Sequence, residues 1–196
     1  MLGRTLIHSI AYHIGLESAQ TQTTERERET LGWLANGRRA IVELGVFEGV
    51  SARILHRSMD PDGRLWLVDP FFPGRMGICW ARSIAKREVG REKRGEVAFL
   101  DQMSFEAVGG WNTMIDMVFI DADHSFEAVL RDWKDWSPFL VPGGVVALHD
   151  SRVFPGGWVR PADGPVRAVE EIAKTASDFE LLEGVDSLSI LRRRSA

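Results

Sequence analysis

Short apolar runs alternate with segments of helical spacing from about residue 40 to residue 192. Several runs are continuously apolar, which is typical of strands that are buried on both faces of a parallel sheet. The runs predict seven strands with the sequences AIVELG, RLWLVD, EVAFLD, IDMVFID, GVVALHD, FELLE and LSILR. Helices are expected at residues 51–59, 78–89, 126–136 and 166–176. This alternation predicts an α/β fold with a doubly wound, mostly parallel seven-stranded sheet.

Two further segments complete the expected architecture. The last two runs are separated only by GVDS, which predicts an antiparallel hairpin at the C-terminal edge of the sheet. Ahead of the sheet, MLGRTLIHSIAYHIGL is expected to form an amphipathic helix, and Thr24 with Glu27 forms a capping box that starts a second helix. The alternating charges of residues 25–29 are typical of a solvated helical face. We therefore expect an N-terminal helical segment over residues 1–37.

The composition is that of one globular domain. Of the 196 residues, 44% are hydrophobic and 27% are charged, with a formal net charge of -4. A single domain over residues 1–196 is expected, with an α/β core at 40–192. The acidic balance argues against nucleic-acid binding. The chain also has no run of about 20 apolar residues, the length that a bilayer-spanning helix needs. One cysteine, Cys79, excludes an internal disulfide and fits a reducing compartment, so a cytoplasmic protein is expected.

The segment ELGVFEG, from Glu43 to Gly49, ends the first predicted strand and starts the helix after it. Doubly wound folds bind nucleotides at this position. Phe47 occupies the place where a dinucleotide fingerprint needs its middle glycine, so NAD is disfavoured. Asp69 ends the second strand, where a carboxylate can accept hydrogen bonds from a ribose diol. The pattern predicts a nucleoside cofactor without a bulky phosphate at this turn, and Glu43 could bind an amino group or the turn's own amides.

The motif ELGVFEG together with Asp69 resembles the E/D-x-G-x-x-x-G motif and the second-strand acid of class I S-adenosylmethionine-dependent methyltransferases. The match runs from about residue 40 to residue 192. The resemblance implies that Gly45 and Gly49 lie against the methionine part of the cofactor and that Asp69 binds its ribose. It implies further cofactor contacts from Glu43, Val46, Phe47, Gln102, Met103, Ser104 and Asp121.

The resemblance leaves the contact to adenine open. In many members of the family an acid after the third strand contacts this ring, whereas the chain has DQMSFEA there. Asp101 or Gln102 could take the place of that acid, or Met103 could stack on the ring. The sequence therefore predicts the cofactor but assigns no single residue to its adenine ring.

Acidic side chains also end the fourth and fifth predicted strands, at Asp121 and Asp150. A right-handed crossover makes these strands parallel neighbours, so the two carboxylates are expected at one edge of the sheet, near His124 and His149. Carboxylate oxygens suit an octahedral Mg²⁺. The other interpretation is that both acids hold loop amides and that Asp123 or Ser125 caps the following helix.

The segment FIDADHSFEA and the later LHD are similar to the methyltransferase subgroup that includes the macrocin O-methyltransferases, where F-I-D-x-D-H-S-[YF] and L-H-D recur. In metal-dependent members of the catechol O-methyltransferase type, acids after the fourth and fifth strands hold Mg²⁺. The resemblance therefore implies Mg²⁺ ligands at Asp121 and Asp150. Ser151 takes the place of the asparagine that is the third ligand there, and His124 could complete the site instead.

The implied function is S-adenosylmethionine-dependent methyl transfer, with Mg²⁺ assisting O-methylation of a small hydroxylated substrate such as a sugar, an antibiotic-like molecule or a phenol. Asp121 would hold the metal and His124 would accept the proton, with His149 as the other candidate base. Two alternatives stay open at this point. One is a metal-independent small-molecule methyltransferase, and the other is a protein that binds S-adenosylmethionine without catalysis.

Two loops are longer than a turn requires: PFFPGRMGICW after the second strand and SRVFPGGWVRPADGP after the fifth. Both follow carboxyl ends of strands, where the ligand crevice of an open α/β sheet lies, so they are candidate lids. The other interpretation is that Trp80 and Trp158 simply pack on the edge of the sheet. Apolar lids left partly exposed predict a homodimer that covers them.

Overall fold

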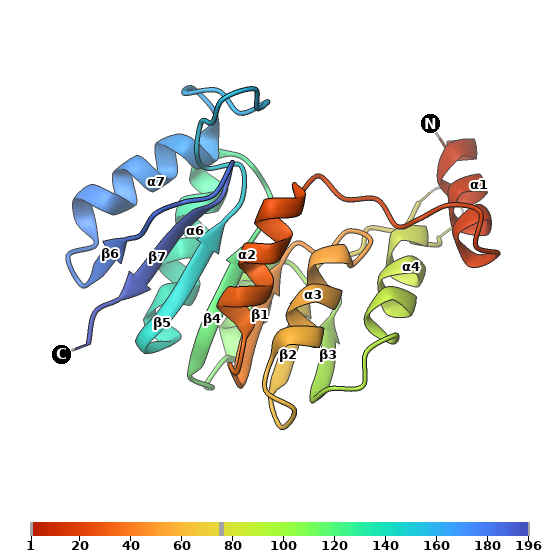
Figure 1. The fold of residues 1–196 in the computed structure, drawn as a ribbon, viewed down its shortest axis with the longest axis horizontal. Helices are drawn as coiled ribbons and strands as arrows, with labels where there is room; N and C mark the ends of the chain where they lie inside the picture. The colour runs from red at the N-terminus through yellow and green to blue at the C-terminus, as the bar shows by residue number, and fades with distance from the viewer. Residues whose placement is uncertain (1, 75–76, 196) are drawn as a thin grey trace.

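Within residues 2–74 and 77–195, which the computed structural model describes, seven strands form one sheet through the middle of the molecule (Figure 1). The strands are β1 Ala40–Leu44, β2 Arg64–Val68, β3 Glu96–Leu100, β4 Ile115–Ile120, β5 Leu140–Leu148, β6 Phe179–Leu181 and β7 Ser189–Arg193. Their order is β3-β2-β1-β4-β5-β7-β6. The first five strands are parallel, and β7 runs antiparallel to both β5 and β6. This topology confirms the predicted fold class and the antiparallel edge hairpin.

Helices cover both faces of the sheet (Figure 1). They are α1 Leu2–His13, α2 Glu25–Ala35, α3 Val50–Ser58, α4 Trp80–Val89, α5 Ser104–Ala107, α6 Phe126–Trp136 and α7 Gly164–Thr175, with 3-10 turns at Val108–Gly110 and Ser137–Phe139. Apolar side chains of α2, α3 and α4 pack on one face, and those of α6 and α7 pack on the other. Helix α1 packs against α4. No helix among the described residues combines the length and apolar character of a bilayer-spanning segment.

Neighbouring residues of the central strands point into different halves of the core. Ile41 of β1 belongs to the apolar cluster under α2 and α3, whereas the next residue, Val42, belongs to the cluster under α6 and α7. Both side chains are fully buried. Because side chains alternate between the faces of a strand, a strand covered on both sides must be apolar throughout. This is the physical reason for the continuous apolar runs in the sequence.

Helix α2 differs from the prediction at one position. Thr24 and Glu27 form the predicted capping box. Glu27, however, is fully buried and does not belong to a solvated face. Residues four and seven positions later, Leu31 and Leu34, are also buried, so Glu27 lies on the stripe of α2 that faces the sheet. The expectation of a solvated face was wrong for this residue because helical periodicity outweighs the local alternation of charges.

The two predicted lid loops are located at the same edge of the sheet, at the carboxyl ends of β2 and β5. In the first loop, residues 75 and 76 lie outside the described residues. In the second loop, Trp158 is 46% exposed and its indole Nε1 donates a hydrogen bond to Asp150 at 2.7 Å. Trp158 therefore contacts the residue at the end of β5 while keeping part of its ring open to solvent.

Candidate functional site

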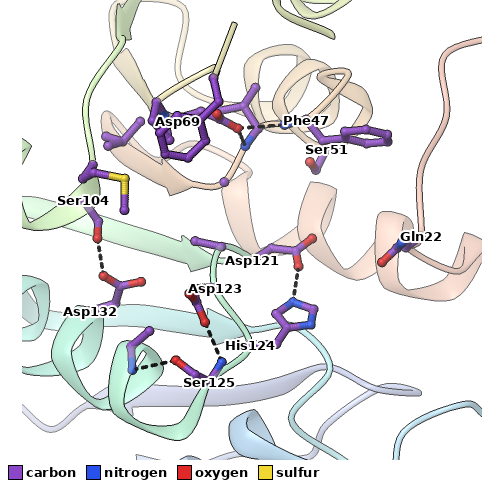
Figure 2. Close-up of a pocket in the computed structure, with 18 of the residues that line it drawn as sticks. Gln22, Phe47, Ser51, Asp69, Ser104, Asp121, Asp123, His124, Ser125 and Asp132 are labelled. Carbon is purple, nitrogen blue, oxygen red and sulfur yellow. Dashed lines mark hydrogen bonds and ion pairs between the residues drawn. The ribbon is translucent and has the colours of Figure 1, made fainter. Parts of the chain in front are cut away.

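A cavity of about 790 Å³ opens at the carboxyl ends of the parallel strands. It lies where the strand order reverses between β1 and β4, the usual ligand position of doubly wound sheets. Figure 2 shows Asp69 and Ser51 on one side of it and Asp123, Ser125 and Asp132 on the opposite side. Its lining includes seven of the residues predicted to contact the cofactor: Gly45, Val46, Phe47, Asp69, Met103, Ser104 and Asp121. The other three, Glu43, Gly49 and Gln102, do not line it.

The glycine turn after β1 packs directly on the chain leaving β4. A Cβ atom at Gly45 would lie 2.0 Å from the carbonyl oxygen of Asp121, and the φ angle of Gly45 is +84°. Only glycine fits this position. Gly49 has a different environment, because its Cβ would lie 2.8 Å from the Cα of Ala85 in α4. Gly45 thus shapes the cavity, whereas Gly49 allows α3 and α4 to pack closely.

Asp69 holds the glycine turn in place from the end of β2. Its Oδ2 accepts hydrogen bonds from the backbone amides of Val46 at 2.9 Å and Phe47 at 3.1 Å, and its Oδ1 accepts one from Phe71 at 2.7 Å. Phe47 has a φ angle of +50°, a left-handed conformation that costs free energy and is often found at functional sites. A carboxylate has about four acceptor positions, so Asp69 can arrange the turn and still accept a bond from a ligand.

Glu43 of β1 lies behind the cavity wall. The hydroxyl group of Ser51, which does line the cavity, donates a hydrogen bond to Oε1 of Glu43. No donor among the described residues reaches its buried Oε2. Burial raises the pKa of Glu43 well above its usual range, and the negative charges of Asp121 and Asp69 add to this effect. The environment of Glu43 therefore favours its neutral form, and the residue contacts the cavity through Ser51.

The ends of β4 and β5 bring a cluster of charged side chains together. Oδ1 of Asp121 lies 3.1 Å from Nδ1 of His149 and 3.3 Å from Nε2 of His124. Nδ1 of His124 lies 3.6 Å from Oδ2 of Asp150. On the far side of His149, its Nε2 lies 3.4 Å from Oε2 of Glu27 in α2. The structure thus brings together the side chains expected at this edge and adds Glu27, which the sequence analysis did not place here.

Charges of opposite sign alternate through this cluster. Burial favours a neutral Asp121, but its hydrogen bonds with His124 and His149 outweigh burial and lower its pKa to about 2. Burial also favours a neutral His149, but Asp121 and Glu27 outweigh it and raise the pKa of His149 to about 10. The hydrogen bond with Asp121 raises the pKa of His124 above its usual range. At neutral pH the buried His149 is therefore a cation between two carboxylates.

The predicted third metal ligand points away from the cluster. The hydroxyl group of Ser151 is buried, donates to the carbonyl oxygen of Leu148 at 2.7 Å and accepts from the amide of Ser189 at 3.2 Å. The ligand atoms that do converge, all within 4.8 Å of one another, belong to Asp121, His124 and His149. One carboxylate and two imidazoles form a softer donor set than Mg²⁺ prefers. Ser151 therefore does not face this cluster, whereas Asp121 and Asp150 both lie beside His124, and the implied magnesium site stays a prediction.

The residues that follow the third strand lie at the far end of the cavity in part only. Asp101 forms an ion pair with Arg82 at 2.6 Å and does not line the cavity. Met103 and Ser104 do line it, and the hydroxyl group of Ser104 donates to Asp132 of α6. Asp132 was not predicted as a site residue from the sequence. The signal was available in the helical periodicity, because Asp132 shares the buried stripe of α6 with Val129 and Trp136.

A glycine turn packed on the chain leaving β4, an acid at the end of β2 and a cavity at the switch point together define a doubly wound fold of the class I methyltransferase type. Residues 42–151 match the methyltransferase domain family. This match covers more than half of the chain and includes both the glycine turn and the cluster at β4 and β5. The chain belongs to this family, and its predicted recognition as a class I S-adenosylmethionine-dependent methyltransferase is confirmed.

Solved structures share the fold over nearly the whole chain. An O-methyltransferase from Bacillus cereus, in complex with S-adenosylhomocysteine, is 20% identical, covers 99% of this chain and 90% of its own, and has a TM-score of 0.65. TomG, an O-methyltransferase from Streptomyces achromogenes involved in tomaymycin synthesis, is 20% identical over 97% and 90% of the two chains, with a TM-score of 0.63.

An N-methyltransferase has the same architecture. NodS from Bradyrhizobium japonicum is 14% identical over 87% of this chain and 96% of its own, with a TM-score of 0.58. One fold thus carries methyl transfer to oxygen in two neighbours and to nitrogen in another. The likeness therefore describes the fold, and the acceptor of this protein has to be inferred from the side chains of its own site.

Proposed function

We propose that this protein transfers the methyl group of S-adenosylmethionine to a hydroxyl group of a small, neutral molecule, within a single domain. One observation carries the proposal. The cavity extends from Ser104 and Asp132, past Asp69 and the glycine turn, to His124, whose imidazole lies between two carboxylates. A nucleoside fits along the first part, with its ribose at Asp69, and the reacting atoms fit at the His124 end.

S-adenosylmethionine supplies an electrophilic methyl group on a sulfonium. The protein has to align the acceptor with that group, exclude water and remove the proton of the hydroxyl group. As the oxygen–carbon bond forms, the sulfur–carbon bond breaks and its electron pair stays on sulfur, which gives S-adenosylhomocysteine. The proton of the hydroxyl group passes to the base. Gly45 and Asp69 serve the alignment, since they set the shape of the cavity beside the chain leaving β4.

His124 is the base in this proposal. It lines the cavity, and 41% of its side chain is exposed. Its Nε2 hydrogen-bonds to Asp121, so we assign the proton of the neutral ring to Nε2. Nδ1 is then free to accept the proton of the acceptor, and Asp150, 3.6 Å away, stabilises the resulting cation. Both carboxylates therefore support proton uptake by the same ring.

His149 has a positioning role. Its side chain is completely buried between Glu27 and Asp121, and a pKa of about 10 keeps it protonated at neutral pH. A residue that is already protonated cannot act as the base. Its positive charge instead keeps Asp121 ionised and fixes the carboxylate that orients His124. We therefore propose His124, and not His149, as the group that accepts the proton.

The donor set supports the metal-independent form of the reaction. His124 lies between the carboxylates of Asp121 and Asp150, the hydroxyl group of Ser151 bonds to the backbone, and Oδ1 of Asp150 accepts the indole proton of Trp158. His124 then removes the proton of the hydroxyl group without Mg²⁺ first lowering the pKa of that group. Mg²⁺ stays a prediction from that resemblance, and its requirement is open to a direct test.

The lining of the cavity favours a neutral acceptor. Among the described residues it includes five acidic side chains and one arginine, Arg131, which lies over the ring of Phe105 at 4.0 Å. Residues 20–22 and Phe47, which is 51% exposed, offer amide, hydroxyl and aromatic surfaces in the cavity that His124 also lines. Arg82 of α4 is paired with Asp101 and takes no part. A sugar, an antibiotic-like molecule or a phenol fits this lining better than a nucleic acid or another polyanion.

Turnover with and without metal tests the proposal. Purified protein is incubated with S-adenosylmethionine and panels of neutral sugars and phenols, and S-adenosylhomocysteine formation is measured after EDTA treatment and after addition of Mg²⁺. We expect turnover of at least one acceptor, with the same rate in both conditions. Turnover that EDTA abolishes and Mg²⁺ restores would support the metal-assisted alternative. Cofactor binding without turnover across both panels would support a non-catalytic binding protein.

A further inference from the structure

The loop after β3 contributes no acid to the lining of the nucleoside end of the cavity. Asp101, the acid of that loop, is paired with Arg82 outside the lining, with 2.6 Å between Nη2 and Oδ2. Gln102 does not line the cavity either. Of the alternatives that the sequence left open for the adenine contact, only Met103 reaches the cavity. A thioether can pack on a ring, but it cannot recognise an amino group with the strength of a carboxylate.

An acid reaches this end from the opposite wall. Asp132 lies in the middle of α6, is only 4% exposed and lines the cavity. Its Oδ1 accepts a hydrogen bond from the hydroxyl group of Ser104. No donor among the described residues reaches its Oδ2. Figure 2 shows Asp132 directed toward Ser104 across this end of the cavity.

No ion pair joins Asp132 to a cation among the described residues, although the nearby charge of Arg131 acts to lower its pKa. The nearest candidate in the sequence, Arg131, lies over the ring of Phe105 at 4.0 Å. Burial raises the pKa of Asp132 to about 6, and the negative charges of Asp135 and Asp123 add to this effect. Above that pH the carboxylate is ionised with a single hydrogen bond. Buried charges are normally paired or fully hydrogen-bonded, so a donor from a ligand would complete its environment.

We propose that Asp132 recognises the exocyclic amino group of adenine and so makes the site selective for an adenine nucleoside. This inference rests on the proposed function, which places the ribose at Asp69 and the methyl group at His124, so that the base lies beside Met103 and Ser104. An amino group only donates hydrogen bonds to a carboxylate, whereas a keto group at the same ring position only accepts them. At this ring position the carboxylate of Asp132 therefore favours the amino group of adenine over the keto oxygen of hypoxanthine.

The test compares two ligands that differ at this group and at the adjacent ring nitrogen N1, which carries a proton in the keto form. S-adenosylhomocysteine and S-inosylhomocysteine, which carries a keto oxygen instead of the amino group, are titrated calorimetrically at pH 7.5. A hydrogen bond to a charged group corresponds to about a tenfold to hundredfold change in affinity. We therefore expect wild type to prefer the adenine ligand by about tenfold or more, and Asp132→Ala to bind both ligands within about threefold of each other.

Two variants separate recognition from a structural role. Asp101→Ala removes the acid that directly follows β3 and is paired with Arg82, and it should keep the preference for adenine. Ser104→Ala breaks the hydrogen bond within the protein but leaves the carboxylate of Asp132 in place, so it should also keep the preference. If Asp132 only anchors α5 through Ser104, Ser104→Ala and Asp132→Ala will behave alike, and the inference is wrong.

The outcomes distinguish this inference from the proposed function. If wild type binds neither ligand, the proposed function fails. If wild type binds S-adenosylhomocysteine and Asp132→Ala keeps the full preference, only the role of Asp132 is contradicted. Thermal unfolding of each variant checks the fold. Should Asp132→Ala be unfolded, Asp132→Asn replaces it: its amide can donate to a keto group, so a preference below that of wild type supports the inference and an unchanged preference contradicts it.

Discussion

The two ends of the cavity each contain an aspartate, half-buried Asp121 and buried Asp132, and the two residues behave in opposite ways. At the catalytic end, His124 and His149 lower the pKa of Asp121 to about 2 in spite of burial. At the nucleoside end, burial raises the pKa of Asp132 to about 6, and among the described residues only the hydroxyl group of Ser104 donates a hydrogen bond to it. The comparison shows that charged neighbours, and not burial alone, decide the state of a buried acid. The catalytic end is electrostatically complete within the protein, whereas the nucleoside end is completed by a ligand.

The largest expected effect is a loss of turnover at the catalytic end, with little change in ligand affinity at the nucleoside end. His124→Ala removes the base, and loss of a general base typically lowers the rate by about 10²- to 10⁴-fold. The affinity for S-adenosylhomocysteine should stay within about threefold of wild type, because His124 lies at the far end from the nucleoside. Steady-state kinetics and calorimetry measure the two quantities.

Two observations accompany this variant. His13→Ala serves as a control, since His13 bonds to the carbonyl oxygen of Ser9 in α1 and not to the cavity. In wild type, turnover should rise with pH as His124 loses its proton, with an apparent pKa above 6.5 because Asp121 raises it. Full activity of His124→Ala would show that another group removes the proton.

The second prediction concerns Glu27, which lies behind the catalytic end and pairs with His149. Glu27→Ala leaves the buried charge of His149 with one partner fewer and removes the hydrogen bonds from the amide and hydroxyl groups of Ser187. Breaking one partner of a buried ion pair costs about 3–5 kcal/mol of unfolding free energy. Urea denaturation measures this loss. Glu29→Ala is the matched control, because Glu29 lies in the same helix but is exposed.

The third prediction concerns pH and tests the charge of His149. Its pKa is about 10 in the folded protein against a usual value of 6.5, so the folded state binds the extra proton between these values. Stability from this group is fully present below pH 6.5 and is lost as the pH rises through 10. We expect unfolding free energies measured by urea to fall from pH 7 to pH 10, and to fall less steeply in His149→Phe. Equal slopes in both proteins would contradict a protonated His149.

The smallest expected effect is a change in stability with pH at the nucleoside end, caused by the ionisation of Asp132. The folded protein binds a proton at Asp132 more tightly than the unfolded chain does, so this residue lowers stability as the pH rises from about 4 to 6. Asp132→Asn removes the buried charge, and we expect it to raise the unfolding free energy at pH 8 by about 1–3 kcal/mol. At pH 4 the variant should gain nothing. A loss of stability at pH 8 would mean that a donor within the protein already compensates the charge.

Much of the fold could be predicted from local patterns. The continuous apolar runs identified the strands because β1 to β5 are covered on both faces, and the capping box at Thr24 and Glu27 identified the start of α2. The predicted contacts of Glu43 and Gly49 with the cofactor depend on tertiary packing, which local patterns do not reveal. Glu43 lies behind Ser51, and Gly49 packs on Ala85, so neither lines the cavity. The homodimer stays a prediction. It rests on apolar side chains left exposed in the two loops, such as Phe72, which is 72% exposed.

The sequence by itself determined the α/β class, the glycine turn and the positions of Asp69, Asp121 and Asp150 at the ends of strands, because these follow from periodicity and from spacing along the chain. Only the tertiary structure decided which side chains meet. Glu27 and Asp132 come from helices on opposite faces of the sheet, far along the chain from the groups they bind. Whether a buried acid is paired depends on residues distant in sequence, and folding alone brings those charges within a few ångströms of each other.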